Sequence, residues 1–278
     1  MKQASIHEAQ AVSANLNKKV KVYVVGTSTG YASFLNNTLV NWIEEADLVL
    51  FTGGEDISTA LYRQAKGKFT DDPNIVRDSI EINAAEEAMK LKKPIFGTCR
   101  GAQLGCALSG GLLVQHMNHP YNHNLRLYDG TIIQTNSLHH QLQNPYNLHP
   151  SKYIVAGHSK GLSNIYLNGE DSNIILRSST YKGEESYTIE PELVYYRENN
   201  WLGIQGHPEM MPYNASLPKL LRRMVDLQIE NRLDIVLSLD IPIIRYLDKP
   251  LVLRMDEIQI YEQIVEKRIK ALAELEIN

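Results

Sequence analysis

The feature that most constrains this fold is the alternation of short β-branched runs with segments of helical periodicity. The runs stop at glycine or at a glycine-containing turn and occupy residues 20–25, 47–52 and 95–97. Apolar residues at helical spacing accompany them over residues 31–46, 74–92 and 101–109. Apolar strands that alternate with helices are typical of a parallel sheet covered on both faces. We therefore predict an α/β fold with a mostly parallel central sheet.

Beyond residue 110 the pattern changes. Short β-like runs separated by turn residues occupy residues 131–134, 153–156, 173–176 and 193–196, which favours antiparallel strands at one edge of the sheet. One more strand is predicted at 201–205, and helical spacing returns over 219–239 and 255–276. The predicted parts of the chain are an N-terminal tail (1–18), a main α/β domain (19–225) and a helical C-terminal extension (226–278).

Composition narrows the class of protein. Apolar residues make up 43% of the 278 residues, enough for a substantial core, and the net charge of −4 is spread without a basic stripe that would suggest nucleic acid. The chain contains two cysteines, Cys99 and Cys106, which is typical of a reducing compartment rather than a disulfide-stapled secreted fold. No apolar signal core opens the sequence and no run approaches a membrane span. We predict a soluble, cytoplasmic protein.

The most informative stretch is the turn at residues 97–101 (GTCRG), which has the pattern G-x-C-x-G. This is the nucleophile-elbow pattern with cysteine in place of serine. A nucleophile on a sharp strand-to-helix turn needs small neighbours, and the following helix lowers the thiol pKa and offers N–H groups to an oxyanion. The alternative is a buried structural cysteine in a tight turn, which is our interpretation of Cys106.

A second turn supplies a candidate base. The predicted strand at 201–205 runs into Gly206, followed by His207-Pro208-Glu209. A cysteine nucleophile needs a base within hydrogen-bond reach, and the base needs a third group that fixes its tautomer. His207 and Glu209 can fill these roles, although His-Pro-Glu alone is a common loop tripeptide.

Taken together, these turns resemble those of the class I glutamine amidotransferases, most closely their stand-alone γ-glutamyl hydrolase branch. The matching segments occur in family order and are TGGEDIS (52–58), RDSIEINAAEEA (77–88), PIFGTCRGAQLG (94–105), GGLLVQH (110–116), NSLHHQ (136–141) and GIQGHPEM (203–210). The resemblance implies the flavodoxin-like amidotransferase fold, a three-layer sandwich, for residues 19–225. The front end is short, because stand-alone relatives usually fit a further β-α step between the first two strands.

The resemblance also implies residue roles. Cys99 would attack a γ-glutamyl carbonyl to form a thioester, His207 would move the proton and Glu209 would orient His207. The N–H groups of Gly54 and Arg100 would form the oxyanion hole. The remaining residues implied to line the substrate pocket are Gly53, Gln103, Asn136, Ser137 and His139. No cofactor is implied.

Several motifs have plainer interpretations. Gly53-Gly54 can be a simple strand-end turn, and we interpret Arg77, Asp78 and Glu81 as a structural ion-pair set on one helix. Residues 157–161 (GHSKG) match the serine-hydrolase pattern, but the polar, β-branched sequence that follows does not predict a helix, so we reject Ser159. His116, His119 and His123 have metal-like spacing, but the sequence shows no carboxylate close by, so we predict no metal site.

Three functions remain open. The chain can be a free hydrolase of glutamine or of γ-glutamyl amines and peptides, a glutaminase subunit that delivers ammonia to a separate synthetase, or a catalytically silent binding module. The apolar stripe from Ile258 to Leu275 must be buried. Residues 226–278 therefore form either a cap on the domain or the interface with a second copy or a synthetase partner.

Overall fold

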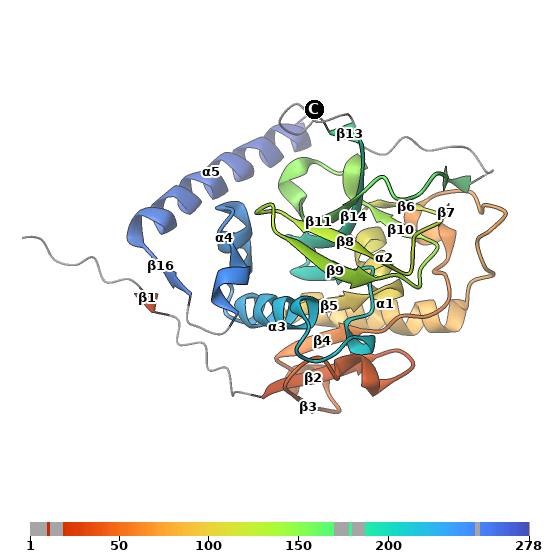
Figure 1. The fold of residues 1–278 in the computed structure, drawn as a ribbon, viewed down its shortest axis with the longest axis horizontal. Helices are drawn as coiled ribbons and strands as arrows, with labels where there is room; N and C mark the ends of the chain where they lie inside the picture. Colours follow the sequence, from red (N-terminus) through yellow and green to blue (C-terminus); the bar gives the residue numbers. More distant parts are fainter. Residues whose placement is uncertain (1–9, 12–18, 170–177, 180–186, 248–250, 278) are drawn as a thin grey trace, which may run out of the picture.

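The structure is a computed structural model that describes residues 10–11, 19–169, 178–179, 187–247 and 251–277. A ten-stranded sheet runs through it (Figure 1). Its strands lie in the order β3 (Asn37–Leu39), β2 (Val20–Val25), β4 (Leu48–Phe51), β5 (Ile95–Thr98), β15 (Trp201–Ile204), β14 (Tyr187–Tyr196), β11 (Tyr153–Lys160), β8 (Asn122–Leu127) and β9 (Ile132–Asn136), with β13 (Ser178–Ser179) paired to β14.

The sheet has two halves of different kinds. From β3 to β15 every neighbouring pair is parallel. From β15 through β14, β11 and β8 to β9 every pair is antiparallel. We call these the parallel half and the antiparallel half. The predicted strands at 131–134, 153–156, 193–196 and 201–205 are confirmed, whereas residues 173–176 lie outside the described residues.

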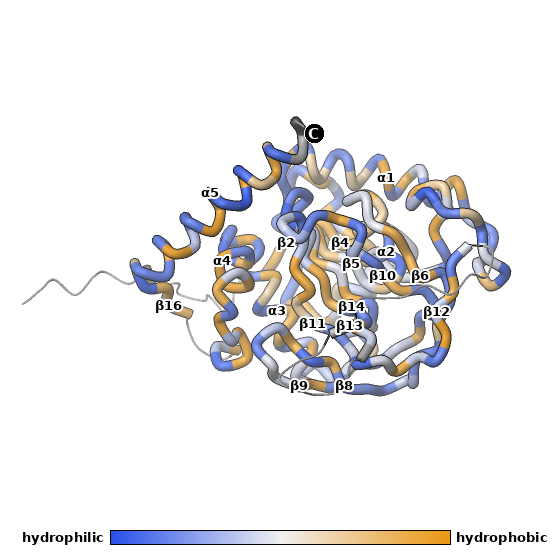
Figure 2. The backbone as a smooth tube through the Cα atoms, turned by 90° about the horizontal axis from the view of Figure 1, so that it is seen from above, coloured by the Kyte–Doolittle hydropathy of each residue, from blue (hydrophilic) through white to orange (hydrophobic). Residues whose placement is uncertain are grey.

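The helices form the outer layers. They are α1 (Ile75–Lys90), α2 (Arg100–Leu108), α3 (Ser216–Ile229), α4 (Leu233–Ser238) and α5 (Met255–Ile277). Alternate side chains of β4 point to opposite faces of the sheet. Leu48 and Leu50 pack in the same apolar cluster as α3 and α4. Val49 and Phe51 pack in the cluster of α1 and α2 on the other face. Figure 2 shows α1 and α3 on opposite sides of the strands. The predicted three-layer α/β sandwich is thus confirmed.

Among the described residues, three pairs of short strands lie outside the main sheet. They are β1 (Gln10–Ala11) with β16 (Val252–Leu253), β6 (Leu112–Val114) with β10 (Leu142–Asn144), and β7 (His116–Met117) with β12 (Tyr166–Leu167). The second pair ties the end of α2 to the segment 136–141, which contributes to the candidate site below.

The helix predicted from the periodicity of residues 31–46 is wrong. That segment forms 3₁₀ turns at Thr29–Ala32 and Ile43–Glu45 on either side of the edge strand β3. The Asn37 side-chain amide donates to the carbonyls of Ala32 (2.7 Å) and Leu35 (3.1 Å), which closes the first turn before a helix can extend. The missing helix fits the short front end noted in the sequence.

The C-terminal helix α5 lies on the domain along one stripe. Its half-buried residues recur at helical spacing, and no described side chain of α5 is fully buried. The carboxylate of Asp234 in α4 anchors it, because Tyr261 and Arg268 of α5 reach Asp234 Oδ2 at 3.0 and 2.9 Å. None of the helices described is both long and apolar enough to cross a membrane.

Candidate active site

Cys99 occupies the turn between β5 and α2, as the G-x-C-x-G pattern predicts. Its backbone has φ = 50° and ψ = −106°, a conformation that costs a non-glycine residue about 1–3 kcal/mol. The Cys99 N–H donates to the carbonyl of Ile204 on β15 at 2.7 Å, which holds the turn against the neighbouring strand. The side chain is buried but not sealed, at 7% exposure.

The two glycines of the motif are required by close packing. A Cβ on Gly97 would lie 2.3 Å from the carbonyl carbon of Gly101. A Cβ on Gly101 would lie 2.5 Å from the carbonyl oxygen of Phe51 on β4. Only glycine at both positions therefore lets α2 approach the sheet closely enough to place its N-terminus behind the Cys99 turn.

His207 follows β15, the parallel neighbour of β5, so both chains reach the same edge of the sheet. Its Nδ1 donates to Glu209 Oε1 at 2.7 Å, and the two side chains are 6% and 8% exposed. Burial lowers the pKa of His207, but a hydrogen bond with Cys99, the hydrogen bond with Glu209 and the negative charge of both raise it to about 10. The geometry brings together a strained thiol, an imidazole and a carboxylate.

Asn136, at the end of β9, holds the backbone of His207. Its Oδ1 accepts from the His207 N–H at 2.7 Å and its Nδ2 donates to the His207 carbonyl at 3.0 Å. Both polar atoms of the amide are thus engaged in positioning the imidazole. The substrate contact implied for Asn136 stays a prediction.

The loop after β4 is held by a buried ionic network. Arg77 on α1 donates to the Gly53 carbonyl at 2.8 Å and pairs with Glu55 at 2.5 Å and Glu81 at 2.7 Å. The exposed Gly54 has φ = 148°, and a Cβ there would meet the Arg77 guanidinium at 2.1 Å. The absence of a side chain at Gly54 therefore leaves room for the Arg77 guanidinium, which holds the loop in place.

Arg100, the first residue of α2, extends this network. Its fully buried guanidinium pairs with Asp78 at 2.5 Å and Glu81 at 3.0 Å and donates to the Glu55 carbonyl at 2.6 Å. The structural interpretation of Arg77, Asp78 and Glu81 is confirmed, but the set is not confined to one helix, because Asp78 pairs with Arg100 of α2. The network fixes the Gly54 loop relative to the first turn of α2. These two segments carry the N–H groups of Gly54 and Arg100 that are predicted to form the oxyanion hole.

Tyr31 is a site residue that the sequence reasoning missed. Its ring lies 6.1 Å from the His207 ring, and its hydroxyl lies 2.7 Å from where a Gly53 Cβ would be. Burial and the negative charges of Glu209 and Cys99 raise the pKa of Tyr31. The residue belongs to a 3₁₀ turn in the segment taken as a helix, so no sequence pattern indicated it.

Two of the other residues predicted to line the pocket contact Gln141. Gln103 Nε2 donates to the Gln141 carbonyl at 3.4 Å, and His139 Nδ1 donates to it at 2.8 Å. Ser137 is buried, and its N–H donates to the Tyr121 carbonyl at 2.6 Å. Burial holds the pKa of His139 well below its usual value, so its ring is neutral.

The serine motif is not an elbow. Ser159 lies within β11, its hydroxyl is buried, and the chain after Lys160 passes through a loop rather than into a helix. Cys106 is also inert, because complete burial raises the pKa of its thiol to about 12. Both findings agree with the sequence interpretation.

The reasoning about the loop histidines is wrong in one respect. The sequence shows no carboxylate near His116, His119 and His123, but β14 brings Glu190 to 3.0 Å from His119 and Glu192 to 2.7 Å from His123. These partners lie 71 and 69 residues away in the sequence, which is why spacing alone did not show them.

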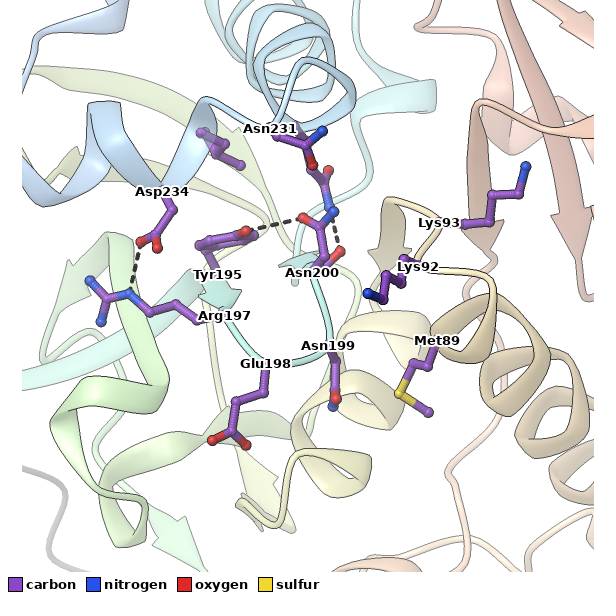
Figure 3. A pocket seen from close by; sticks show the side chains of 12 residues that line it. Met89, Lys92, Lys93, Tyr195, Arg197, Glu198, Asn199, Asn200, Asn231 and Asp234 are labelled. Carbon is purple, nitrogen blue, oxygen red and sulfur yellow. Dashed lines mark hydrogen bonds and ion pairs between the residues drawn. The ribbon is translucent and has the colours of Figure 1, made fainter. Parts of the chain in front are cut away.

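A separate pocket lies at the opposite edge of the sheet (Figure 3). Lys93 precedes β5 and Asn200 precedes β15, so the pocket opens at the amino ends of the strands whose carboxyl ends lead to Cys99 and His207. Tyr195 donates to Asn200 at 3.0 Å within it. The pocket is thus distinct from the Cys99 site.

Several solved structures share a low similarity with this chain. Two solved structures are a glutamine amidotransferase from Thermotoga maritima (13% identity, TM-score 0.45, covering 92% of this chain and 97% of that one) and the glutaminase domain of Trypanosoma brucei CTPS with bound acivicin (11% identity, TM-score 0.46, covering 77% and 95%).

Protein sequences give a closer match. Protein NtpR of Enterococcus hirae is 27% identical over 180 residues, covering 61% of this chain and 69% of NtpR. A glutamine amidotransferase-like protein of Lactococcus lactis, YvdE, is 26% identical over 172 residues, covering 61% and 68%. The profile of the peptidase C26 family matches residues 2–144, just over half of the chain. The chain therefore belongs to the peptidase C26 family, within the class I glutamine amidotransferase-like superfamily.

Proposed function

We propose that this protein is a cysteine hydrolase that cleaves a γ-glutamyl amide bond, in glutamine or in a γ-glutamyl amine or peptide. Family membership supports an amide-hydrolysing enzyme of the glutamine amidotransferase type. The observation that carries the proposal is the strained Cys99 turn beside His207, whose Nδ1 is bound to Glu209 at 2.7 Å. This arrangement matches what a thiol nucleophile requires of its base and of the group that orients the base.

The proposed acylation step uses each of these groups once. His207 takes the thiol proton, and the Cys99 sulfur attacks the γ-carbonyl carbon to give a tetrahedral oxyanion. The N–H groups of Gly54 and Arg100 stabilise the negative charge. The C–N bond then breaks, His207 donates its proton to the leaving amine, and a γ-glutamyl thioester remains on Cys99.

Deacylation repeats the chemistry with water. His207 takes a proton from a water molecule, which attacks the thioester carbonyl through a second oxyanion. The C–S bond breaks, glutamate leaves and the proton returns to the sulfur. Glu209 keeps Nδ1 protonated throughout, so that Nε2 is the nitrogen that exchanges protons.

The experiment is glutamate release from glutamine and from a panel of γ-glutamyl amines and peptides. Cys99→Ala should reduce release from the best substrate by at least about 10⁴-fold, because the residues of a triad act as a unit. Cys106→Ala is the matched control and should keep activity, because its thiol is sealed in the core. Equal activity in both variants would refute the role of Cys99.

A second candidate is a glutaminase subunit that works only with a synthetase partner. The observation that supports it concerns α5, which packs on the domain through one face only. On this helix, Ile260 and Ile269 are 49% and 61% exposed. Exposed apolar side chains of this kind are typical of association surfaces. Glutamine hydrolysis that requires an added partner would favour this function, and turnover by the purified chain alone would exclude it.

A further inference from the structure

A buried histidine–glutamate cluster lies apart from the proposed catalytic triad. His119 and His123 belong to the segment that leads from β7 into β8, and Glu190 and Glu192 belong to β14. The four side chains are at most 3% exposed. One nitrogen or oxygen atom from each of His119, His123 and Glu192 lies within 4.8 Å of the other two. Imidazole and carboxylate donors grouped in this way suit a first-row divalent metal.

Glu190 fixes the position of the proton on His119. Its Oε2 lies 3.0 Å from His119 Nε2, and since a carboxylate only accepts, Nε2 carries the hydrogen. The Glu190 carboxylate also accepts from the N–H groups of Leu162 (3.1 Å) and Ser163 (3.0 Å) and from the hydroxyl of Tyr166 (2.5 Å). The fully bonded Glu190 is thus the outer carboxylate of a carboxylate–histidine–metal arrangement.

The other ring nitrogen of His119 faces into the cluster. In the tautomer that carries its hydrogen on Nε2, Nδ1 holds a lone pair. It is buried, has no hydrogen-bond partner among the described residues, and lies 4.0 Å from Glu192 Oε1. A buried lone pair without a donor is unfavourable unless something outside the protein chain satisfies it.

His123 and Glu192 repeat the pattern. Nδ1 of His123 donates to the Pro120 carbonyl at 3.1 Å, which points Nε2 at Glu192 Oε1, 2.7 Å away. A lone pair and a carboxylate oxygen at that distance repel unless a proton or a metal ion lies between them. The second oxygen of Glu192 is buried and has no partner in the described part of the chain. One cation would satisfy both oxygens and both nitrogens of the cluster.

The spacing is compatible with a tetrahedral ion. Ligand atoms about 2.0–2.1 Å from a tetrahedral Zn²⁺ lie about 3.3 Å from one another, and the distances of 2.7 and 4.0 Å from Glu192 Oε1 bracket that value. His139 lies alongside, with its ring centroid 5.2 Å from that of His119. Its Nδ1 is committed to the Gln141 carbonyl, and its Nε2 is buried without a partner in the described residues.

We propose that His119, His123 and Glu192 bind Zn²⁺. The ion would join the segment before β8 to β14. Because β8 pairs with β9, where Asn122 lies opposite Asn136, the metal would also support the strand whose last residue holds the backbone of the proposed base.

The test is zinc binding by the full chain in a Cys99→Ala background, which removes the thiol as an alternative ligand. After treatment with a chelator and dialysis against Zn²⁺, elemental analysis should find about one ion per chain. Glu192→Gln, which keeps size but removes charge, should weaken binding measured by calorimetry at least about 100-fold. His140→Gln is the matched control, because His140 belongs to a different cluster with Asp56 and Asp71.

The outcomes separate cleanly. No zinc above the buffer level in the folded Cys99→Ala protein would overturn the proposal, as would unchanged binding by Glu192→Gln. Loss of zinc in His140→Gln would assign the ion to the other cluster and also overturn it. If Glu192→Gln does not fold, Co²⁺ added to the Cys99→Ala protein decides, since intense visible bands of tetrahedral nitrogen and oxygen ligation are expected and their absence contradicts the site.

Discussion

The two halves of the central sheet assemble their polar side chains differently. In the parallel half, Cys99 and His207 stand at the carboxyl ends of neighbouring strands, so each is placed by its own strand-end turn. In the antiparallel half, His119 and His123 contact Glu190 and Glu192 of β14, which lie 71 and 69 residues further along the chain. The carboxyl ends of parallel strands gather residues at one edge of the sheet, whereas the contacts of the antiparallel half join β14 to the segment at β8, with β11 between them in the sheet. The parallel half is therefore sensitive to changes at its turns, and the antiparallel half to changes in the side chains that link its strands.

The largest expected effect is on the ionic network of the parallel half. Arg100→Met leaves the buried Asp78 and Glu81 short of a cation and should lower the free energy of unfolding by about 3–5 kcal/mol. In the antiparallel half, Glu190→Gln preserves the shape of the side chain, and the neutral groups that donate to Glu190 stay in place. This substitution should lower the free energy of unfolding by about 1–3 kcal/mol. Urea unfolding followed by circular dichroism measures both. Equal losses would contradict the distinction.

The next effect concerns glycine. Gly97→Ala places a methyl group 2.3 Å from backbone atoms of Gly101 and should lower the free energy of unfolding by about 3 kcal/mol, with loss of Cys99 reactivity. Gly130 lies between β8 and β9, where a Cβ would meet no atom within 4 Å but the backbone has φ = 85°. Gly130→Ala should therefore lower the free energy of unfolding by only about 1 kcal/mol. Thermal unfolding compares the two. A larger loss for Gly130→Ala would show that backbone strain outweighs packing.

These contrasts explain how much the sequence could predict. The Cys99 turn, its helix and the His207 turn are local patterns, so strand, helix and triad candidates could be read directly. Asn136 was assigned to the pocket, but its bonds to the backbone of His207 depend on β9 reaching the end of β15. Tyr31 and the pairing of His119 with Glu190 depend wholly on tertiary placement. Spacing along the chain carries no signal for such contacts.

A smaller effect separates two histidines by pH. Hydrogen bonds and the charges of Cys99 and Glu209 raise the pKa of His207 to about 10, so its stabilisation is complete below pH 6.5 and is lost as the pH rises towards 10. The difference in Tm between wild type and His207→Gln should shrink over that window, by a few degrees, corresponding to on the order of 2 kcal/mol.

The comparison residue is His158 in the antiparallel half, where burial lowers the pKa. The contribution of the neutral His158 ring to stability is present above pH 6.5 and is lost as the pH falls below that value. The difference in Tm between wild type and His158→Gln should therefore shrink towards acid pH, whereas the difference for His207→Gln shrinks towards alkaline pH. Thermal scans from pH 5 to 10 test both signs together. A difference that does not change with pH for His207→Gln would mean that its imidazole is neutral throughout.

The smallest effect distinguishes two thiols on the same turn and helix. Cys106 is sealed in the core, where burial raises its pKa to about 12, whereas Cys99 lies at the strained start of α2. Because only a thiolate reacts readily, iodoacetamide at pH 8 should label wild type and Cys106→Ser equally and leave Cys99→Ser unlabelled. Cys106→Ser should also lower the free energy of unfolding by only about 1 kcal/mol, since the new hydroxyl can donate to the Leu112 carbonyl that the thiol now contacts at 3.3 Å. Labelling of Cys99→Ser would mean that α2 opens in solution, and the packing of its glycines against β4 would then be weaker than the close contacts imply.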